Sequence, residues 1–289
     1  MSAKSPRRAR RQLPKTRPAA PSRRPQRSPS GKPAPSPAIA DQEAPAELIG
    51  ASPAIQDVRA RILTLVRPGG ERPNVLLEGE AGTGKSLVAS LLHRLGRPQA
   101  PVVIVDCAAA PETYLRETLF GVPPEDSQAR PWLQPGLLEL VTGGTIVLEE
   151  VCGLPKALQA MLVKALGPPP PGSRRAQAVP PWVIGTCNSD MDAAVRMGHV
   201  REDLFRQLAG VRIVMPPLRE CGDDAVIIAN WLLPRICGQH HRPLMTLAPE
   251  VGQRFLEYGW PGSVRELTHM LTRAVLLSTS SVISAEELW

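Results

Sequence analysis

The sequence predicts an α/β fold in which a mostly parallel sheet carries helices on both faces and a small helical domain follows. Short apolar runs that suit buried strands alternate with stretches of helical spacing as far as residue 217, and this alternation is typical of a parallel sheet. Residues 79–86 read G-x-x-x-x-G-K-S between a predicted strand and a predicted helix, which is the pattern of a phosphate-binding loop. Beyond Pro216-Pro217 only helical patterns remain.

The elements follow in this order along the chain. The apolar runs predict five strands, at 74–77, 102–105, 145–148, 183–186 and 211–214. Helical spacing predicts helices at 55–66, 86–95, 112–120, 154–166, 225–236, 249–258, 264–278 and 285–289. Proline-rich stretches at 121–136 and 167–181 predict loops. We therefore expect a tail at 1–45, an α/β nucleotide-binding domain at 46–217 and a helical lid domain at 218–289.

Composition limits the class of protein. No apolar run approaches the length that spans a bilayer, so we expect no membrane partner. Five cysteines, an odd number without a C-x-x-C pair, indicate buried and reduced thiols, which are typical of the cytoplasm. The cysteines therefore predict a cytoplasmic protein. Because aromatic residues make up only 3% of the chain, we expect its core to be aliphatic.

The basic charge lies in the first 40 residues, which hold 11 of the 34 Lys and Arg residues and no acid. Without them the chain has 23 basic and 27 acidic residues. Richness in Pro, Ser, Ala and Arg predicts a disordered tail, because such a composition buries too little apolar surface to offset chain entropy. The clusters at 7–11 and 23–24 are suited to nucleic-acid phosphates, and a solvated tail without a defined target is an equal alternative.

The phosphate-binding loop fixes a class of ligand. It comprises Gly79, Glu80, Ala81, Gly82, Thr83, Gly84, Lys85 and Ser86. The glycines let backbone N–H groups close around phosphate oxygens, and the helix that begins there points the positive end of its dipole at them. We expect Lys85 to reach the β- and γ-phosphates of a nucleoside triphosphate and the Ser86 hydroxyl to reach Mg²⁺.

Two acids, Glu149 and Glu150, follow the third predicted strand. We expect one carboxylate to hold Mg²⁺ through water and the other to activate the water that attacks the γ-phosphate. Many strands end in acids, so this motif is weak by itself. Its position downstream of the phosphate-binding loop makes it informative.

An ordered series of further segments resembles one family. The segments are 48–54, 107–109, 119–121, 143–150, 201–204, 216–220 and 260–267, which read LIGASPA, CAA, LFG, GGTIVLEE, REDL, PPLRE and WPGSVREL. Together with the phosphate-binding loop, they resemble the AAA+ ATPase domain of bacterial sigma-54-dependent transcription activators (enhancer-binding proteins) over residues 48–287. The resemblance implies an AAA+ P-loop NTPase fold with a helical lid, ATP and Mg²⁺ as cofactors, a hexameric ring, and sigma-54 RNA polymerase as partner.

The resemblance also implies binding roles for individual residues. Ile49 and Arg265 would contact the nucleotide together with the loop residues, among which Thr83 and Lys85 bind phosphate. Ser86 and Glu149 would hold Mg²⁺.

Three residues carry catalytic roles by the same resemblance. Glu150 would be the catalytic base, and Asn188 would sense the γ-phosphate. Arg201 resembles an arginine finger that acts on the nucleotide of the neighbouring subunit, and such a finger can be worth about 10³–10⁵ in rate. Catalysis is therefore expected to require a ring.

The chain departs from the family at several of these positions. Glu149 replaces the metal-binding aspartate, and its longer arm predicts slow turnover because Mg²⁺ demands near-ideal octahedral geometry. Asp106 replaces an asparagine that contacts the catalytic glutamate. Two carboxylates in contact repel, so either one is protonated or they stay apart. Gln207 stands at the position of a second trans-acting arginine, and Cys187 at that of a threonine.

The largest departure follows Gly121. The family carries Gly-Ala-Phe-Thr-Gly-Ala in a surface loop that grips sigma-54, whereas residues 125–130 read Glu-Asp-Ser-Gln-Ala-Arg. Ser127 stands where the phenylalanine would dock, so we expect weak or absent sigma-54 contact. The chain also stops at Trp289, where a helix-turn-helix follows in many members, so we expect no DNA-binding module.

Two functions remain open at this point. The first is an ATP-binding and ATP-hydrolysing AAA+ transcription regulator of the sigma-54 activator type. The second is a non-remodelling, ATP-binding regulatory or assembly partner in mixed AAA+ rings. The retained Lys85, Glu150, Arg201 and Arg265 favour use of ATP. The altered loop favours the second function.

Overall fold

The computed structural model describes residues 47–70, 72–122, 135–168 and 179–289. The predicted tail at 1–45 and the altered loop at 125–130 lie outside the described residues. Within them, none of the helices combines the length and the hydropathy needed to cross a bilayer.

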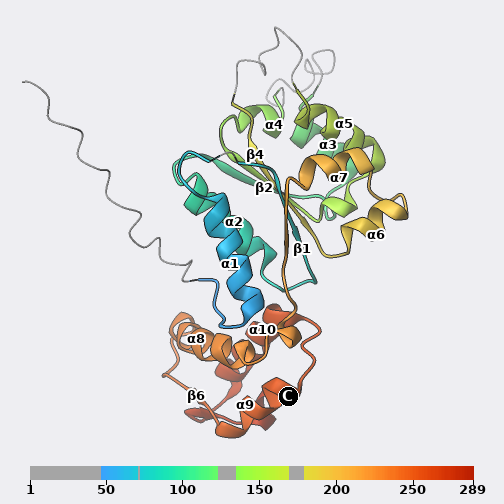
Figure 1. Ribbon diagram of the computed structural model, residues 1–289. Helices are drawn as coiled ribbons and strands as arrows, with labels where there is room; N and C mark the ends of the chain where they lie inside the picture. The colour runs from blue at the N-terminus through green and yellow to red at the C-terminus, as the bar shows by residue number, and fades with distance from the viewer. Residues whose placement is uncertain (1–46, 71, 123–134, 169–178) are drawn as a thin grey trace, which may run out of the picture. The chain divides into compact units, whose positions relative to one another are not determined.

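A five-stranded sheet forms the centre of the α/β part (Figure 1). Its strands are β1 (Val75–Glu78), β2 (Val102–Asp106), β3 (Thr145–Glu149), β4 (Trp182–Cys187) and β5 (Val211–Val214). They lie in the order β2-β3-β4-β1-β5, and every ladder in this sheet is parallel. The prediction of a parallel α/β sheet is confirmed.

The register of these ladders aligns the strand ends. Glu78 at the end of β1 lies opposite Cys187 at the end of β4, and Asp106 of β2 lies opposite Glu149 of β3. Since parallel strands present their carboxyl ends at one edge, the predicted site residues that follow these strands gather there.

Helices cover both faces of the sheet. They are α1 (Pro53–Leu65), α2 (Lys85–Gly96), α3 (Glu112–Phe120), α4 (Leu137–Leu140), α5 (Lys156–Leu166), α6 (Met191–Arg196) and α7 (Glu202–Leu208), with a 3₁₀ turn, η2, at Val151–Gly153. Alternating strand residues divide the core: Val75 and Leu77 pack with α1 and α2, whereas Leu76 packs with α3, α5 and α7. The short helices α4, α6 and α7 were not predicted, because segments of 4 to 7 residues show too little of the helical period.

The chain continues into a lid of mainly helical structure. Its elements are η4 (Leu218–Glu220), α8 (Asp224–Gln239), β6 (Thr246–Leu247), α9 (Pro249–Glu257), α10 (Ser263–Leu277), β7 (Val282–Ile283) and α11 (Ala285–Leu288). The helical lid was predicted, but the absence of strands beyond residue 217 was wrong, because β6 and β7 form a two-residue parallel ladder. Strands this short carry no detectable alternation.

A buried carboxylate fixes the start of the α/β part against the lid. Asp224, 1% exposed at the beginning of α8, accepts hydrogen bonds from the N–H groups of Ala51 (2.5 Å) and Ser52 (3.1 Å). Gly50 has a φ of 143°, and a Cβ there would lie 2.6 Å from a carboxylate oxygen of Asp224. The chain therefore approaches this carboxylate through its backbone, which a side chain at Gly50 would block.

We expect Asp224→Ala to lower the free energy of unfolding by about 2 kcal/mol, because charge-assisted hydrogen bonds to buried N–H groups are lost. Chemical denaturation of the purified chain measures it. Asp223→Ala is the matched control, since that neighbour is exposed and makes no side-chain capping bond. Equal stabilities of the two variants would contradict the assignment.

Candidate functional site

The loop between β1 and α2 closes around its own lysine. Lys85, only 6% exposed, donates from Nζ to the carbonyl oxygens of Gly79 (2.7 Å) and Glu80 (2.9 Å) and to Oδ1 of Asn188 (2.5 Å). Burial lowers the pKa of Lys85, and the nearby Glu150 carboxylate opposes that shift. The ammonium group is thus held at the centre of the loop.

The two acids at the end of β3 have different partners. Glu149 Oε1 accepts from the Ser86 hydroxyl at 2.5 Å. Glu150 adopts a left-handed backbone with a φ of 52°, its N–H donates to Thr186 Oγ1 (3.1 Å), and its carboxylate accepts from the N–H of Asn188 (3.2 Å). The unusual backbone turns the chain after Glu149, so the consecutive carboxylates have separate environments.

Glu150 has the environment of a general base. Burial raises its pKa, and the negative charges of Asp106 and Glu149 act in the same direction, against the hydrogen bond from Asn188 and the charge of Lys85. A carboxylate whose pKa lies nearer to neutrality takes up a proton more readily.

These groups line one cavity of about 410 Å³. Its described lining consists of Gly82, Gly84, Lys85, Ser86, Asp106, Glu149, Glu150, Thr186, Asn188 and Arg265. The cavity joins the positive loop and the start of α2 on one side to three carboxylates on the other. Such an arrangement is suited to a polyanion bound together with a hard cation.

The donors beside the loop fit Mg²⁺. Ser86 and Glu149 offer oxygen ligands 2.5 Å apart, and Mg²⁺ is usually held by one or two carboxylates together with phosphate oxygens and water. In the described residues no group of three or more His, Cys, Asp or Glu side chains could form a metal site of protein ligands alone. A cation here would therefore depend on oxygens of the bound ligand.

The lid reaches the loop in two places. The N–H of Arg265 donates to the carbonyl oxygen of Gly82 (3.3 Å), and a Cβ added to Gly82, whose φ is 83°, would collide with the carbonyl oxygen of Gly262. Arg219 in η4 also pairs with the Glu80 carboxylate, at 2.5 and 2.8 Å. The position of the loop therefore depends on the lid.

The side chain of Asp106 hydrogen-bonds to the backbone that follows β2. Its Oδ1 accepts from the N–H groups of Ala108 (2.9 Å) and Ala109 (3.0 Å), which turns the chain after β2. Both acids face the same cavity, and the charge of Asp106 contributes to the raised pKa of Glu150.

Several predicted residues lie elsewhere. The described lining of the cavity includes neither Ile49, which packs half-buried against the core, nor Arg201. Ala81 is exposed at the tip of the loop, and Thr83 donates from its hydroxyl to the carbonyl of Glu80 (2.9 Å), which tightens the loop from within.

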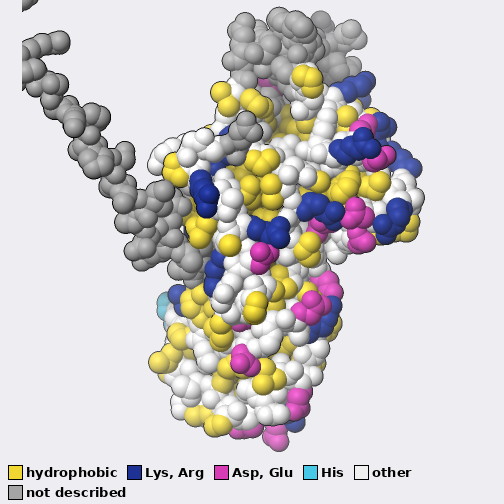
Figure 2. Space-filling view, viewed as in Figure 1, with side chains coloured by type: hydrophobic (Ala, Val, Ile, Leu, Met, Phe, Trp, Pro, Cys, Tyr) yellow, Lys and Arg dark blue, Asp and Glu magenta, His cyan; other side chains and the backbone are white. Residues whose placement is uncertain are grey.

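Arg201 lies on the outer surface at the start of α7. Its guanidinium pairs with Asp203 at 2.7 and 3.0 Å, and both side chains are 45% exposed. The fully buried Gln159 holds its backbone, accepting from the N–H of Arg201 (2.8 Å) and donating to the carbonyl of His199 (2.9 Å). The backbone is fixed while the side chain is exposed. Figure 2 shows mixed basic and acidic side chains on the surface in the region of α6 and α7.

Gln207, at the family position of the second trans-acting arginine, directs its side-chain amide into the protein. Its amide donates to the carbonyl of Val163 (3.2 Å), and within the described part of the chain its Oε1 is buried without a hydrogen-bond partner. Arg206, beside it, is exposed and pairs with Glu202.

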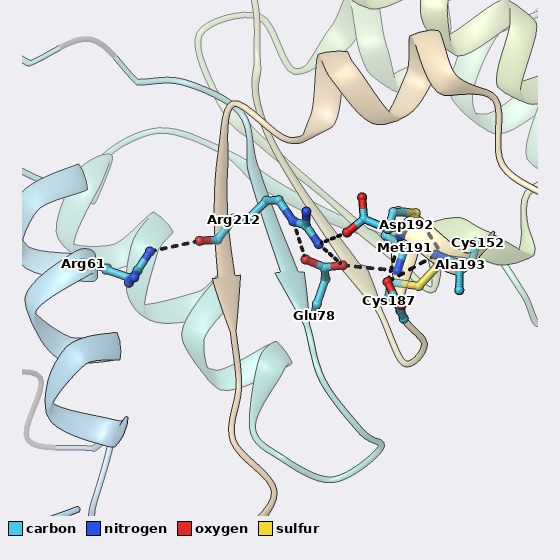
Figure 3. Close-up of polar contacts among 9 residues, drawn as sticks. Arg61, Glu78, Cys152, Cys187, Met191, Asp192, Ala193 and Arg212 are labelled. Carbon is cyan, nitrogen blue, oxygen red and sulfur yellow. Dashed lines mark hydrogen bonds and ion pairs between the residues drawn. A yellow bond between two sulfur atoms is a disulfide. The ribbon is translucent and has the colours of Figure 1, made fainter. Parts of the chain in front are cut away.

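The sequence analysis did not predict an ion network of Glu78, Arg212 and Asp192, which begins at the residue before the loop. Glu78, 4% exposed, accepts from Arg212 of β5 (2.8 Å) and from the N–H of Met191 (3.2 Å), and Arg212 also pairs with Asp192 (2.8 Å) (Figure 3). The signal in the sequence was a glutamate at the end of a buried apolar strand, since a buried charge needs a partner. Thr186 was missed for a simpler reason, because a threonine is an ordinary strand residue.

The prediction of five free thiols is wrong for two cysteines. Cys152 in η2 and Cys187 at the end of β4 form a disulfide, with Cα atoms 6.1 Å apart. Their separation of 35 residues conceals the pairing, which follows from the adjacency of β3 and β4. Cys107, Cys221 and Cys237 are free and buried, as expected.

We expect Gly82→Ala to weaken ATP binding about tenfold or more, a loss of roughly 1.4 kcal/mol, because the new Cβ forces the loop away from the lid. Calorimetric titration measures it. Gly198→Ala is the matched control: its φ of 71° carries a similar backbone cost, but nothing lies within 4 Å of the added Cβ. Unchanged affinity in Gly82→Ala would show that the contact is dispensable.

Two family comparisons cover nearly the whole described chain. The Sigma-54 interaction domain family matches residues 48–214, and the AAA+ ATPase lid domain family matches residues 219–289. Regulatory protein AtoC of Escherichia coli (strain K12) is 33% identical over 219 residues, which are 74% of this chain and 48% of AtoC. The anaerobic nitric oxide reductase transcription regulator NorR of Salmonella agona (strain SL483) is 36% identical over 239 residues, 81% of this chain and 46% of NorR. The chain thus spans about half the length of these relatives.

Solved structures show the same fold. NtrX from Brucella abortus in complex with ATP has a TM-score of 0.71 at 24% identity, covering 85% of this chain and 57% of NtrX. The Holliday junction branch migration motor RuvB of Thermotoga maritima has a TM-score of 0.54 at 13% identity, covering 83% of this chain and 70% of RuvB. With the family match over residues 48–214, the chain belongs to the Sigma-54 interaction domain family of AAA+ proteins.

Proposed function

We propose that this chain binds ATP with Mg²⁺ and hydrolyses it to ADP and phosphate, as an AAA+ regulator of the sigma-54 activator type. The observation that carries the proposal is the convergence of Lys85, Glu150, Asn188 and Arg265 on one cavity. Related NtrX has been solved with ATP and with ADP, which supports the choice of nucleotide.

The triphosphate occupies the loop and the N-terminus of α2. Backbone N–H groups of the loop and the helix dipole attract its phosphates, and the Lys85 ammonium exchanges its carbonyl partners and Asn188 for phosphate oxygens. Ser86 and Glu149 would hold Mg²⁺, which supplies positive charge that offsets the charge of the phosphates. Arg265 adds a second positive side chain from the lid.

In hydrolysis, Glu150 acts as the general base for the attacking water. The carboxylate takes the proton of that water, while Asn188, hydrogen-bonded to both Glu150 and Lys85, senses the γ-phosphate between them. This assignment requires Glu150 to be ionised before reaction.

Arg201 acts on the nucleotide of a neighbouring subunit. Its side chain is exposed and lies on a rigidly held backbone outside the described lining of its own cavity. A second copy of the chain would bring such an arginine to the cavity, which supports a ring as the active form.

The proposed regulatory role is inferred from the relatives. AtoC and NorR are a regulatory protein and a transcription regulator, so we assign this chain to regulation of transcription through sigma-54 RNA polymerase. The substitutions at 125–130 favour weak remodelling by this chain alone and keep the mixed-ring partner as the second candidate. An assay for ATP-dependent open complexes separates the two, because only the first candidate forms them unaided.

We expect Glu150→Gln to bind ATP with nearly unchanged affinity and to lose at least about 10²-fold in turnover, since general-base catalysis contributes about 10²–10⁴. Lys85→Ala should lose binding itself, and the exposed Glu250→Gln should leave both quantities unchanged. Steady-state ATPase assays and calorimetry measure the set. In the unmodified chain the rate should rise as pH rises through the pKa of Glu150, which burial places above its ordinary value of 4.5. Full turnover by Glu150→Gln would refute the base assignment.

We expect the specific ATPase rate to increase with protein concentration, because each cavity needs Arg201 from another copy. Arg201→Ala should lower the rate by about 10³–10⁵. Arg196→Ala, which removes an exposed arginine five residues before Arg201 in the sequence, is the matched control and should retain the rate. A specific rate independent of concentration, together with an active Arg201→Ala, would contradict action in trans.

A further inference from the structure

The disulfide joins the two segments that carry the proposed catalytic groups. Cys152 follows Glu150 by two residues, and Cys187 directly precedes Asn188. The N–H of Asn188 donates to the Glu150 carboxylate at 3.2 Å. A covalent bond and a hydrogen bond therefore span the same two strand ends, and motion of one segment is transmitted to the other.

The two sulfur atoms differ in access. Cys187 is fully buried, whereas Cys152 is half-buried on η2. Ser189 Oγ lies 3.3 Å from the sulfur of Cys187, and Met191 Sδ lies 3.5 Å from that of Cys152. A small thiol in solution would therefore reach the bond at Cys152.

The segment after Asn188 is anchored independently of the sulfurs. Glu78 accepts from the N–H of Met191, and Arg212 bridges Glu78 and Asp192 (Figure 3). These bonds hold the start of α6 whether or not the disulfide is present. Opening the disulfide would thus free the stretch 187–189 without releasing the helix that follows it.

We propose that Cys152 and Cys187 are a thiol–disulfide modification site that controls ATP turnover, with low-molecular-weight thiols such as glutathione as reductant. The inference rests on the proposed hydrolysis. Disulfides in reducing compartments are usually transient and redox-sensing, which fits a bond beside catalytic groups.

Reduction of the disulfide takes two successive thiol–disulfide exchanges. A thiolate of the reductant attacks the sulfur of Cys152 and breaks the bond to Cys187, whose thiolate takes up a proton. A second thiol attacks the mixed disulfide, which releases Cys152 as a thiol and forms the oxidised reductant. Two electrons pass from two reductant thiols to the protein, and the reverse exchange with the disulfide form of the reductant restores the bond.

The oxidised chain turns over slowly. Asn188 is held by Glu150 at its N–H and by Lys85 at its Oδ1, and the disulfide fixes the residue immediately before it. During turnover Lys85 must leave Asn188 for phosphate, and Asn188 must shift toward the γ-phosphate. Reduction permits this shift. In the described residues the loop reaches this strand end through main-chain atoms, where the N–H of Gly79 donates to the carbonyl oxygen of Cys187 (3.2 Å). That bond uses the carbonyl and not the sulfur, so nucleotide affinity stays the same.

The test compares the full chain equilibrated in oxidised and reduced glutathione. Differential alkylation with intact mass measures the thiols, calorimetry measures ATP affinity, and a steady-state assay measures turnover. We expect two additional alkylatable thiols on reduction, unchanged affinity and about tenfold faster turnover, since displacing a catalytic group by about 1 Å can cost up to 10²-fold. We also expect faster amide hydrogen exchange at 187–189.

Variants separate the disulfide from general thiol effects. Cys152→Ser and, as a second route, Cys187→Ala should turn over at the fast rate in both buffers. Cys237→Ala, a free cysteine in the lid, should keep the full redox response. Equal thiol counts in both buffers would overturn the inference. So would an ATP turnover rate and an amide hydrogen exchange rate that are both the same in the two buffers. Absence of turnover in both buffers would instead refute the proposed hydrolysis, and the redox site would then be judged on thiol counts and amide exchange.

Discussion

Parallel pairing of β1, β4, β3 and β2 in one register brings the ends of four strands to a single edge of the sheet. The partners Glu78–Cys187 and Asp106–Glu149 lie across two of these ladders, with Glu150 one residue further on. A slip of one residue in either ladder would send every side chain of the shifted strand to the opposite face. The cavity, the disulfide and the ion network of Glu78 all depend on this register.

Opposite charges in the cavity stabilise each other against burial. Burial alone lowers the pKa of Lys85 and raises that of Glu150, so each would tend toward its neutral form. The attraction between the two groups opposes both shifts. Since a buried charge without its partner is costly, Lys85 of the loop and Glu150, which follows β3, form an interdependent pair, although 65 positions separate them in the sequence.

Local patterns predicted the strands and the loop, because each depends on a short window of sequence. The resemblance supplied roles for Asn188 and Arg265, which the cavity brings together. The partners of Glu78 and the pairing of Cys152 with Cys187 could not be predicted, because they depend on which strands are neighbours. Ile49 and Arg201 illustrate another limit: each matches a motif, yet lies outside the described lining of the cavity, and a role for Arg201 needs a second chain.

The approach of Gly82 to Gly262 is made by main-chain atoms on both sides. Any rotation of the lid is therefore felt by the loop directly, without passing through a side chain that mutation could shorten or remove. Sequence drift at neighbouring positions would leave this mechanical linkage intact as long as both glycines persist. The orientation of the lid and the shape of the loop are in this way linked through the backbone.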